Sequence, residues 1–298
     1  MNAAELSGVT VLCGGEKLLD SVSLAVPEGE LWVLAGRALA CSHAALRVMA
    51  GRARPDLGTA LVFGRPAHEI RRELGFVACG QSSSATLLRA MPRVRAALRC
   101  RAGAGAPSRS ARVLDALGMD FAQNPIGELS RLERRKTIIA AALLGEPTLL
   151  CIADPLVDLG PAEQRELANG LAAAREAART TIVCSSARLA GFEPIADAFA
   201  VFDGPSLAEV ARSSQLRLGV GERRLLRTAD LARDFVILSR EMPGARLSVE
   251  YDAAEKSRSI RIEGADELTL GEALKRAGAV VLELRSLPLS IDERLGLA

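Results

Sequence analysis

Residues 29–58 read GELWVLAGRALACSHAALRVMAGRARPDLG, and this stretch decides the fold of the chain. Residues 31–35 are all apolar, without polar alternation, which is typical of a strand buried on both faces of a parallel sheet. Gly36 then turns the chain. Residues 44–50 place Leu46 and Met49 on one face of a helix that stops at Gly51. The stretch therefore predicts a buried strand, a turn and a helix.

The same frame carries phosphate-binding loops, which place Gly-x-x-x-x-Gly-Lys-Ser/Thr between a strand and a helix. Over positions 36–43, only the first glycine of that pattern, Gly36, is present. Cys41 stands where the second glycine lets the backbone approach the phosphates, and Ser42 stands where the lysine would be. His43 replaces the hydroxyl that binds magnesium. The sequence keeps the frame of a phosphate site and lacks the residues that do its chemistry.

Composition favours a layered α/β protein in the cytoplasm. The chain is 49% hydrophobic with only 3% aromatic residues, which predicts a core of alanine, leucine and valine. The formal net charge of +2 gives no argument for nucleic acid as a partner. No apolar run approaches the length of a membrane-spanning helix, and the N-terminus lacks a signal-peptide pattern. We therefore expect six reduced cysteines in a cytoplasmic protein.

Strand and helix patterns alternate along the rest of the chain. Strands are predicted at residues 9–12, 22–26, 59–63, 75–78, 148–152, 181–184 and 196–201, and helices at 87–101, 131–144 and 161–178. Ser130 and Glu133 form a capping box that fixes the start of the helix at 131.

Residues 216–298 have a pattern of their own, with the order βαββαβ of a split ferredoxin-like domain. Its predicted strands are 223–227, 247–251, 259–263 and 280–285, and its predicted helices are 229–242, capped by Thr228, and 269–277.

This order resembles the nucleotide-binding subunit of an ATP-binding cassette (ABC) transporter over about residues 7–215. The phrases SLAVPEGE, GRARPDLG and ALLGEPTLL carry the resemblance. It implies an ABC-type P-loop NTPase fold at 1–215, with a parallel-rich α/β sheet and a helical subdomain at about 81–145. A small α+β, ferredoxin-like domain follows at 216–298. The ending SLPLSIDERL, residues 286–295, resembles the Pro-Ser-Leu-Glu-Asp-Val-Phe type of tail in subunits that serve ABC-2 exporters.

The resemblance gives family roles to positions where this chain departs from the family pattern. Cys13 stands where an aromatic residue stacks on adenine, and Cys79 or Gln81 stands at the glutamine loop. LSRLE, residues 129–133, replaces the Leu-Ser-Gly-Gly-Gln signature and keeps Ser130. The remaining positions are Ala153 and Asp154 for the Walker B aspartate and catalytic glutamate, 157–160 for the D-loop, and Ala187 for the switch histidine.

These departures predict a pseudo-ATPase. Hydrolysis requires a cation on the phosphates, a magnesium carboxylate and a residue that orients water. If Asp154 is the base, Ala153 leaves magnesium without its ligand; if Asp154 binds the metal, Pro155 leaves no base. We expect no catalytic residue and weak or no binding of ATP and magnesium. The vestigial nucleotide-binding positions are Gly36, Cys41, Ser42, His43, Ser130 and Gln81.

The resemblance also implies partners: an integral-membrane permease of the ABC-2 type and a paralogous, active ATP-binding subunit, at the inner face of the cell membrane. The basic helix predicted at 87–101, with Arg89, Arg93 and Arg95, is the candidate docking surface, and a solvated helix face is its alternative.

Two alternative functions stay open, and a metal site is set aside. An active ATPase that uses substitute residues and a soluble regulatory scaffold stay open as alternative functions. Cys13, Cys41, Cys79 and His43 match no metal-binding spacing, so we expect no metal site.

Overall fold

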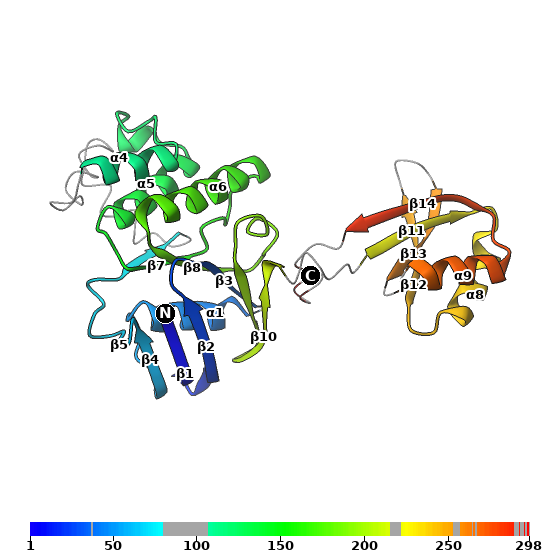
Figure 1. Ribbon diagram of the computed structural model, residues 1–298, viewed down its shortest axis with the longest axis horizontal. Coiled ribbons are helices and arrows are strands. Elements are labelled where there is room, and N and C mark those ends of the chain that lie inside the picture. The colour runs from blue at the N-terminus through cyan, green and yellow to red at the C-terminus, as the bar shows by residue number, and fades with distance from the viewer. Residues whose placement is uncertain are drawn as a thin grey trace. The chain divides into compact units, whose positions relative to one another are not determined.

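The chain folds as two compact units, Met1–Gln215 and Leu216–Gly296 (Figure 1). The computed structural model describes residues 1–36, 38–79, 107–214, 222–252, 257–263, 265, 267–288, 292, 295 and 297. Each unit has its own sheets and its own hydrophobic core.

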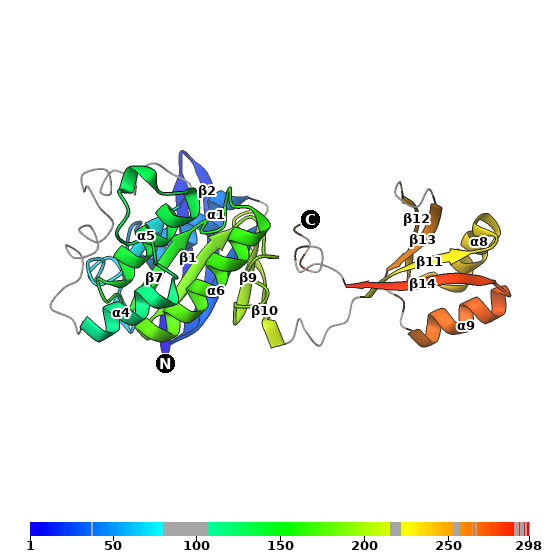
Figure 2. The ribbon, with the colours of Figure 1, turned by 90° about the horizontal axis from the view of Figure 1, so that it is seen from above.

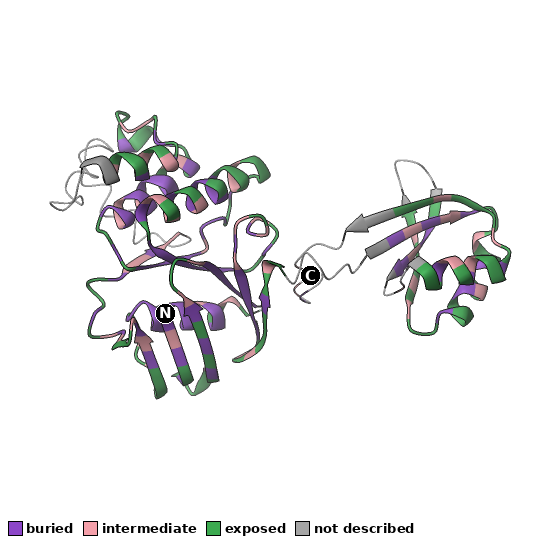
Figure 3. Cartoon of the chain, in the orientation of Figure 1, coloured by how far each residue is buried: buried purple, intermediate pink, exposed green. Residues whose placement is uncertain are grey.

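The first unit is built on a six-stranded sheet ordered β10-β9-β3-β8-β7-β6. The neighbours from β9 to β6 run parallel, and β10 runs antiparallel to β9. The strands are β3 (Leu31–Gly36), β6 (Gly75–Ala78), β7 (Leu149–Ala153), β8 (Thr181–Ser186), β9 (Ala198–Asp203) and β10 (Ser206–Arg212). Every residue of β3, β7 and β8 is buried (Figure 3), as expected for parallel strands covered on both faces.

Helix α1 (Leu39–Met49) lies between this sheet and a second, antiparallel sheet ordered β2-β1-β4-β5 (Figure 1). The strands of the second sheet are β1 (Asn2–Cys13), β2 (Glu16–Pro27), β4 (Leu57–Val62) and β5 (Arg65–Pro66). Leu46 of α1 packs in one core with Leu34 of β3 and Val26 of β2. The apolar strand at Leu31–Gly36 and the helix that follows it therefore form the centre of the unit.

The remaining described helices of the first unit lie on the side of the six-stranded sheet away from α1 (Figures 1 and 2). They are α4 (Pro107–Ala116), the 3-10 helix η1 (Ile126–Glu128), α5 (Arg131–Leu143) and α6 (Pro161–Ala178). The strand–turn–helix and α/β predictions are thus confirmed in the described residues.

Two local predictions were wrong at their boundaries. Helix α1 begins at Leu39 and not at residue 44, because residues 39–43 contain no glycine or proline that would stop the helix from extending. The strands predicted at 9–12 and 22–26 are parts of the much longer β1 and β2. Their pairing has several register shifts, which interrupt the alternation that a sequence pattern would reveal.

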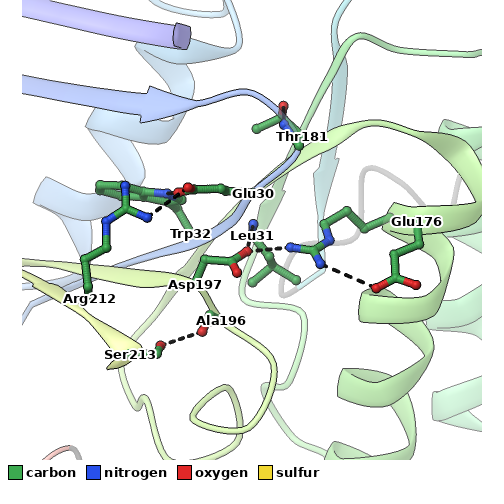
Figure 4. A network of polar contacts seen from close by, with 11 residues as sticks. Glu30, Leu31, Trp32, Glu176, Thr181, Ala196, Asp197, Arg212 and Ser213 are labelled. Carbon is green, nitrogen blue, oxygen red and sulfur yellow. Dashed lines mark hydrogen bonds and ion pairs between the residues drawn. The ribbon is translucent and has the colours of Figure 1, made fainter. Parts of the chain in front are cut away.

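A network of polar contacts fixes the amino end of β3 (Figure 4). The N–H of Leu31 donates to Asp197 Oδ2 at 2.8 Å, and Arg175 Nη1 lies 2.5 Å from the same oxygen. The backbone N–H of Ser213 donates to the carbonyl of Asp197 at 3.0 Å. Asp197 therefore joins the central strand, α6 and the residues that follow β10.

The described strands of the second unit form one antiparallel sheet ordered β12-β13-β11-β14. Its elements in chain order are β11 (Glu222–Thr228), α8 (Leu231–Glu241), β12 (Arg246–Asp252), β13 (Ser257–Glu263), α9 (Glu267–Ala277) and β14 (Val281–Pro288), which is the predicted βαββαβ order. Leu238 of α8 and Leu270 of α9 pack with Leu226 and Ile260, so both helices cover the same face of the sheet.

The predicted cap of the first helix in this unit was wrong. Thr228 is the last residue of β11, and Asp230 caps α8 by accepting a hydrogen bond from the N–H of Arg233 at 3.1 Å. Aspartate is an equally good N-cap residue, and its position directly before the helix places its carboxylate within reach of the third helical N–H.

Candidate functional site

The site predicted from the sequence lies where β3 meets the first turn of α1. Gly36 ends β3, and a Cβ at this position would lie 2.8 Å from the carbonyl oxygen of Phe202, so only glycine fits there. Cys41 is buried, and burial raises the pKa of its thiol. Ser42 is fully buried, and its hydroxyl donates to the carbonyl of Leu39 at 3.0 Å. Cys41 therefore packs in the hydrophobic core, and Ser42 hydrogen-bonds within the first turn of α1.

His43 reaches across the site to the end of β7. Its Nε2 lies 2.8 Å from Oδ2 of Asp154, and the two side chains are 32% and 13% exposed. The distance is that of an ion pair when the imidazole is protonated, while the Nε2 atom makes no hydrogen bond of good geometry with any described residue. The contact joins the helix after the turn to the strand beside it.

Asp154 is held by its backbone at the ends of β7 and β8. Its N–H donates to the carbonyl of Ser185 at 3.0 Å, and its φ of 50° places it in the left-handed region that aspartate tolerates better than most residues. Ser185 is fully buried, and its hydroxyl has no hydrogen-bond partner among the described residues. Asp154 is thus directed toward His43 from a backbone position that few residue types adopt.

Ser130 and Glu133 form the capping box that the sequence predicted. The N–H of Glu133 donates to Ser130 Oγ at 3.2 Å, and the N–H of Ser130 donates to Glu133 Oε2 at 2.7 Å. The capping prediction is confirmed. The two side chains accept hydrogen bonds from backbone N–H groups at the amino end of α5, so capping alone accounts for their positions.

Arg135 is a buried residue that the sequence analysis missed. Its side chain connects α5 to two segments near Asp154. In the segment after β7, Nη1 donates to the carbonyls of Pro155 at 2.9 Å and Val157 at 2.5 Å. Its Nη2 donates to the carbonyl of Cys79 at 3.4 Å. The signal was present in the spacing, since Arg135 shares a helix face with the buried Leu132 and Ile139.

Cys79 follows β6 beside this arginine. Burial raises the pKa of its thiol to about 12; the nearby Arg135 opposes this shift and the Asp154 carboxylate adds to it. Cys79 is therefore a protonated thiol at neutral pH and not a reactive one.

The structure describes only some of the other predicted positions. Ala187 is exposed after the end of β8. Gln81, Arg89, Arg93 and Arg95 lie outside the described residues. Within the part of the chain that the structure describes, there is no group of three or more His, Cys, Asp or Glu side chains suited to a metal ion. No described helix is long and apolar enough to cross a membrane.

Comparison with known proteins gives the family. A sequence profile described as ABC transporter matches residues 19–157. The phosphonates import ATP-binding protein PhnC 1 of Natronomonas pharaonis is 31% identical over 176 residues, which cover 56% of this chain and 76% of that protein. This chain belongs to the ABC transporter ATP-binding subunits. Such subunits generally pair with membrane permeases.

One further relative of this ABC subunit and one solved structure of similar fold extend the comparison. The daunorubicin/doxorubicin resistance ATP-binding protein DrrA of Streptomyces peucetius is 27% identical over 304 residues, covering 98% of this chain and 90% of that protein. The solved structure of cbiO1 from Clostridium perfringens, part of the ABC transporter complex cbiONQ, superimposes with a TM-score of 0.64 at 15% identity. It covers 73% of this chain and 91% of its own. The P-loop NTPase fold of an ABC cassette is confirmed.

Proposed function

We propose that this chain is a catalytically degenerate ABC subunit, a pseudo-ATPase that docks on a membrane permease and pairs with an active ATP-binding subunit. The observation that carries the proposal is the contact of 2.8 Å between His43 Nε2 and Asp154 Oδ2. A working site holds magnesium and phosphate oxygens between the loop helix and the carboxylates after the neighbouring strand. Here two side chains meet directly across that interval.

The side chains present do not fit Mg-ATP. Ser42 stands where a lysine would neutralise phosphate charge, and its hydroxyl is buried against the carbonyl of Leu39. Ala153, which pairs with Ser185 in the sheet, has no carboxylate for magnesium. An imidazole occupies the place of a small hydroxyl and lies against the one carboxylate that remains. The hydroxyl and the first carboxylate that would bind magnesium are therefore both replaced, and the carboxylate of Asp154 lies against an imidazole.

The missing groups would also raise the barrier to ATP hydrolysis. Removing one electrostatic partner of a transition state typically raises the barrier by about 2.7–4 kcal/mol. Here the lysine and one of the two carboxylates are absent together, and Asp154 is engaged by His43. The exposed Ala187 cannot donate or accept a proton in place of a histidine. The combined loss favours a subunit that leaves hydrolysis to its partner.

Two observations support an exporter of the ABC-2 type as the assembly. The relative that matches nearly the whole chain is named as a drug-resistance ATP-binding protein, and its match includes the C-terminal unit. The tail at 286–295 resembles that of subunits serving ABC-2 exporters. On this proposal the chain binds its permease at the inner face of the cell membrane.

The nucleotide experiment measures Mg-ATP binding and hydrolysis by the purified chain. We expect no phosphate release above background and no thermal shift at millimolar Mg-ATP, since real binding would raise the melting temperature by mass action. An ABC subunit with an intact Gly-Lys-Ser/Thr loop serves as the positive control. Turnover that disappears in Asp154→Asn, or a saturable thermal shift, would contradict the proposal and favour an active ATPase with substitute residues.

In addition to the helix predicted at 87–101, a basic hollow in the first unit is a second candidate surface for contact with the permease. It has a volume of about 520 Å³. Its charged lining residues are Arg52, Arg54, His68, Glu69, Arg71 and Arg72. Four arginines against one glutamate give a positive surface, which suits an acidic segment of a partner.

Charge reversal tests the docking surfaces. Arg93→Glu with Arg95→Glu, and separately Arg71→Glu with Arg72→Glu, should reduce co-purification with the permease, because the reversed charges repel an acidic partner. Arg240→Glu, an exposed arginine of α8, is the matched control and should leave the complex intact. If a reversed pair co-purifies as well as the control, that surface is only a solvated face.

A further inference from the structure

The outer strand of the C-terminal sheet presents an unusual combination of apolar exposure and charge. Among the described strands, β14 has only β11 as a neighbour, so its other edge carries backbone groups without a strand partner. Leu282 is 62% exposed and Leu284 is 45% exposed. Val280 and Val281 beside them are exposed as well. A long edge with exposed apolar side chains is a ready template for pairing with another strand.

The register of β14 against β11 fixes which face each side chain occupies. Leu284 lies opposite Leu226, a core residue beneath the two helices, so Leu284 points to the helix-covered face. Glu283 lies opposite Arg227 on the open face. Alternation places Arg285 on that open face too. Within one chain, Glu283 contacts both Arg227, at 3.2 Å, and Arg285.

We propose that a second copy of this chain pairs its β14 antiparallel to this β14, across a two-fold axis at Leu284. In that register, Leu284 lies opposite Leu284 of the other copy on the helix-covered face. Glu283 lies opposite Arg285 of the other copy, and Arg285 lies opposite Glu283, on the open face. The two four-stranded sheets then join into one continuous sheet. A two-fold interface uses the same patch twice, and this patch is complementary to itself.

The charges select this register over its neighbours. If the two-fold axis is perpendicular to the joined sheet, the helices of both copies cover the same face of that sheet. Since neighbouring residues of a strand point to opposite faces, this arrangement requires one residue of β14 to lie opposite the same residue of the other copy. An axis at Glu283 would place two glutamates in contact, and an axis at Arg285 would place two arginines in contact. Like charges directly opposite each other destabilise a strand pair. The axis at Leu284 instead gives two opposite-charge pairs next to an apolar pair.

The other edge of the sheet is the rival surface. Strand β12 exposes Val249 and Tyr251. An axis at Val249 would place Ser248 opposite Glu250, so no opposite charges flank the axis. Charge complementarity therefore favours β14. This inference does not depend on whether the nucleotide site is degenerate.

A cross-linking experiment on the full chain distinguishes the two edges. Leu284→Cys places two thiols at the proposed axis, so mild oxidation should give a covalent dimer in high yield. Val249→Cys is the matched control at the same kind of position on β12 and should give no more dimer than the parent, whose exposed Cys13 sets the background. Dimer from Val249→Cys without dimer from Leu284→Cys would overturn the proposal.

The charge pair gives a second measurement on the same protein. Arg285→Glu places like charges opposite each other on both sides of the axis and should weaken self-association about tenfold. Arg261→Glu makes the same change on the inner strand β13 and should not alter it. Light scattering on the full chain measures the mass. A parent that stays monomeric up to about 100 µM, or an Arg285→Glu chain that associates like the parent, would show that β14 is not an interface.

Discussion

At the scale of single residues, the position of His43 decides how the loop between β3 and α1 is interpreted. Its imidazole Nε2 lies 2.8 Å from Asp154 Oδ2, so the first turn of α1 and the residue that follows β7 are in direct side-chain contact. The backbone has the order of strand, turn and helix: β3 ends in Gly36 and α1 begins three residues later. The site therefore combines the strand, turn and helix of the family's fold with a direct contact between His43 and Asp154.

Rebuilding the loop tests whether the frame still accepts nucleotide. The variant carries Leu39→Gly, Cys41→Gly, Ser42→Lys, His43→Thr and Ala153→Asp. We expect it to fold and to regain measurable Mg-ATP binding without full turnover, since Asp154 is one methylene shorter than glutamate and Ala187 is no histidine. The two glycines should each cost about 1 kcal/mol in the helix.

The control for this variant omits Ser42→Lys and should not bind, because the cation on the phosphates is then missing. Isothermal titration with Mg-ATP makes the comparison, and chemical denaturation measures the stability. A folded variant that still ignores ATP would mean that the loop has repacked around its present side chains, and the chain's role would then be purely structural.

The sequence predicted the residues of this site better than their contacts. Gly36, Ser130 and Glu133 were identified because their signals are local: a turn after an apolar strand and a capping pattern of three residues. The meeting of His43 with Asp154 was not predicted, because it depends on which strands become neighbours in the sheet. Order along the chain carries little information on the distance between two side chains so far apart.

At the scale of elements, α5 is held more firmly than its amphipathic pattern suggests. Arg135 is buried and donates three hydrogen bonds to backbone carbonyls, and Lys136, also buried, lies 2.6 Å from Glu166 of α6. Arg131 donates to the carbonyl of Asp158 at 2.6 Å. A helix rich in basic residues would ordinarily be assigned to solvent. Here the cations fix the helix to α6 and to the segment that follows β7.

Replacing the buried cation measures this attachment. Arg135→Met should reduce the free energy of unfolding by about 2 kcal/mol, because hydrogen bonds from a charged donor are lost and buried carbonyls are left unpaired. Arg134→Met is the matched control one residue earlier: Arg134 is exposed, and the change should stay within about 0.5 kcal/mol. Urea denaturation followed by circular dichroism gives both values. Equal effects would show that Arg135 contributes no more than a surface arginine.

At the scale of the whole molecule, each of the two units packs around its own hydrophobic core. Each described sheet lies within one unit. Leu46 lies in the core of the first and Leu238 in the core of the second, and both are fully buried. Stability in each unit then depends on its own core, and a cavity in one core should not weaken the other.

Calorimetry of two core variants tests this independence. Leu46→Ala and Leu238→Ala should each remove about 3 kcal/mol from their own unit, because each leaves a cavity in a packed core. A given loss shifts the melting temperature more in a smaller unit, since less entropy is gained on unfolding. We expect a shift of about 12–24 °C for the second unit and about 6–12 °C for the first. Each variant should move one transition and leave the other in place. A single transition that both variants shift equally would mean that the units unfold as one, and that the C-terminal unit stabilises the cassette directly.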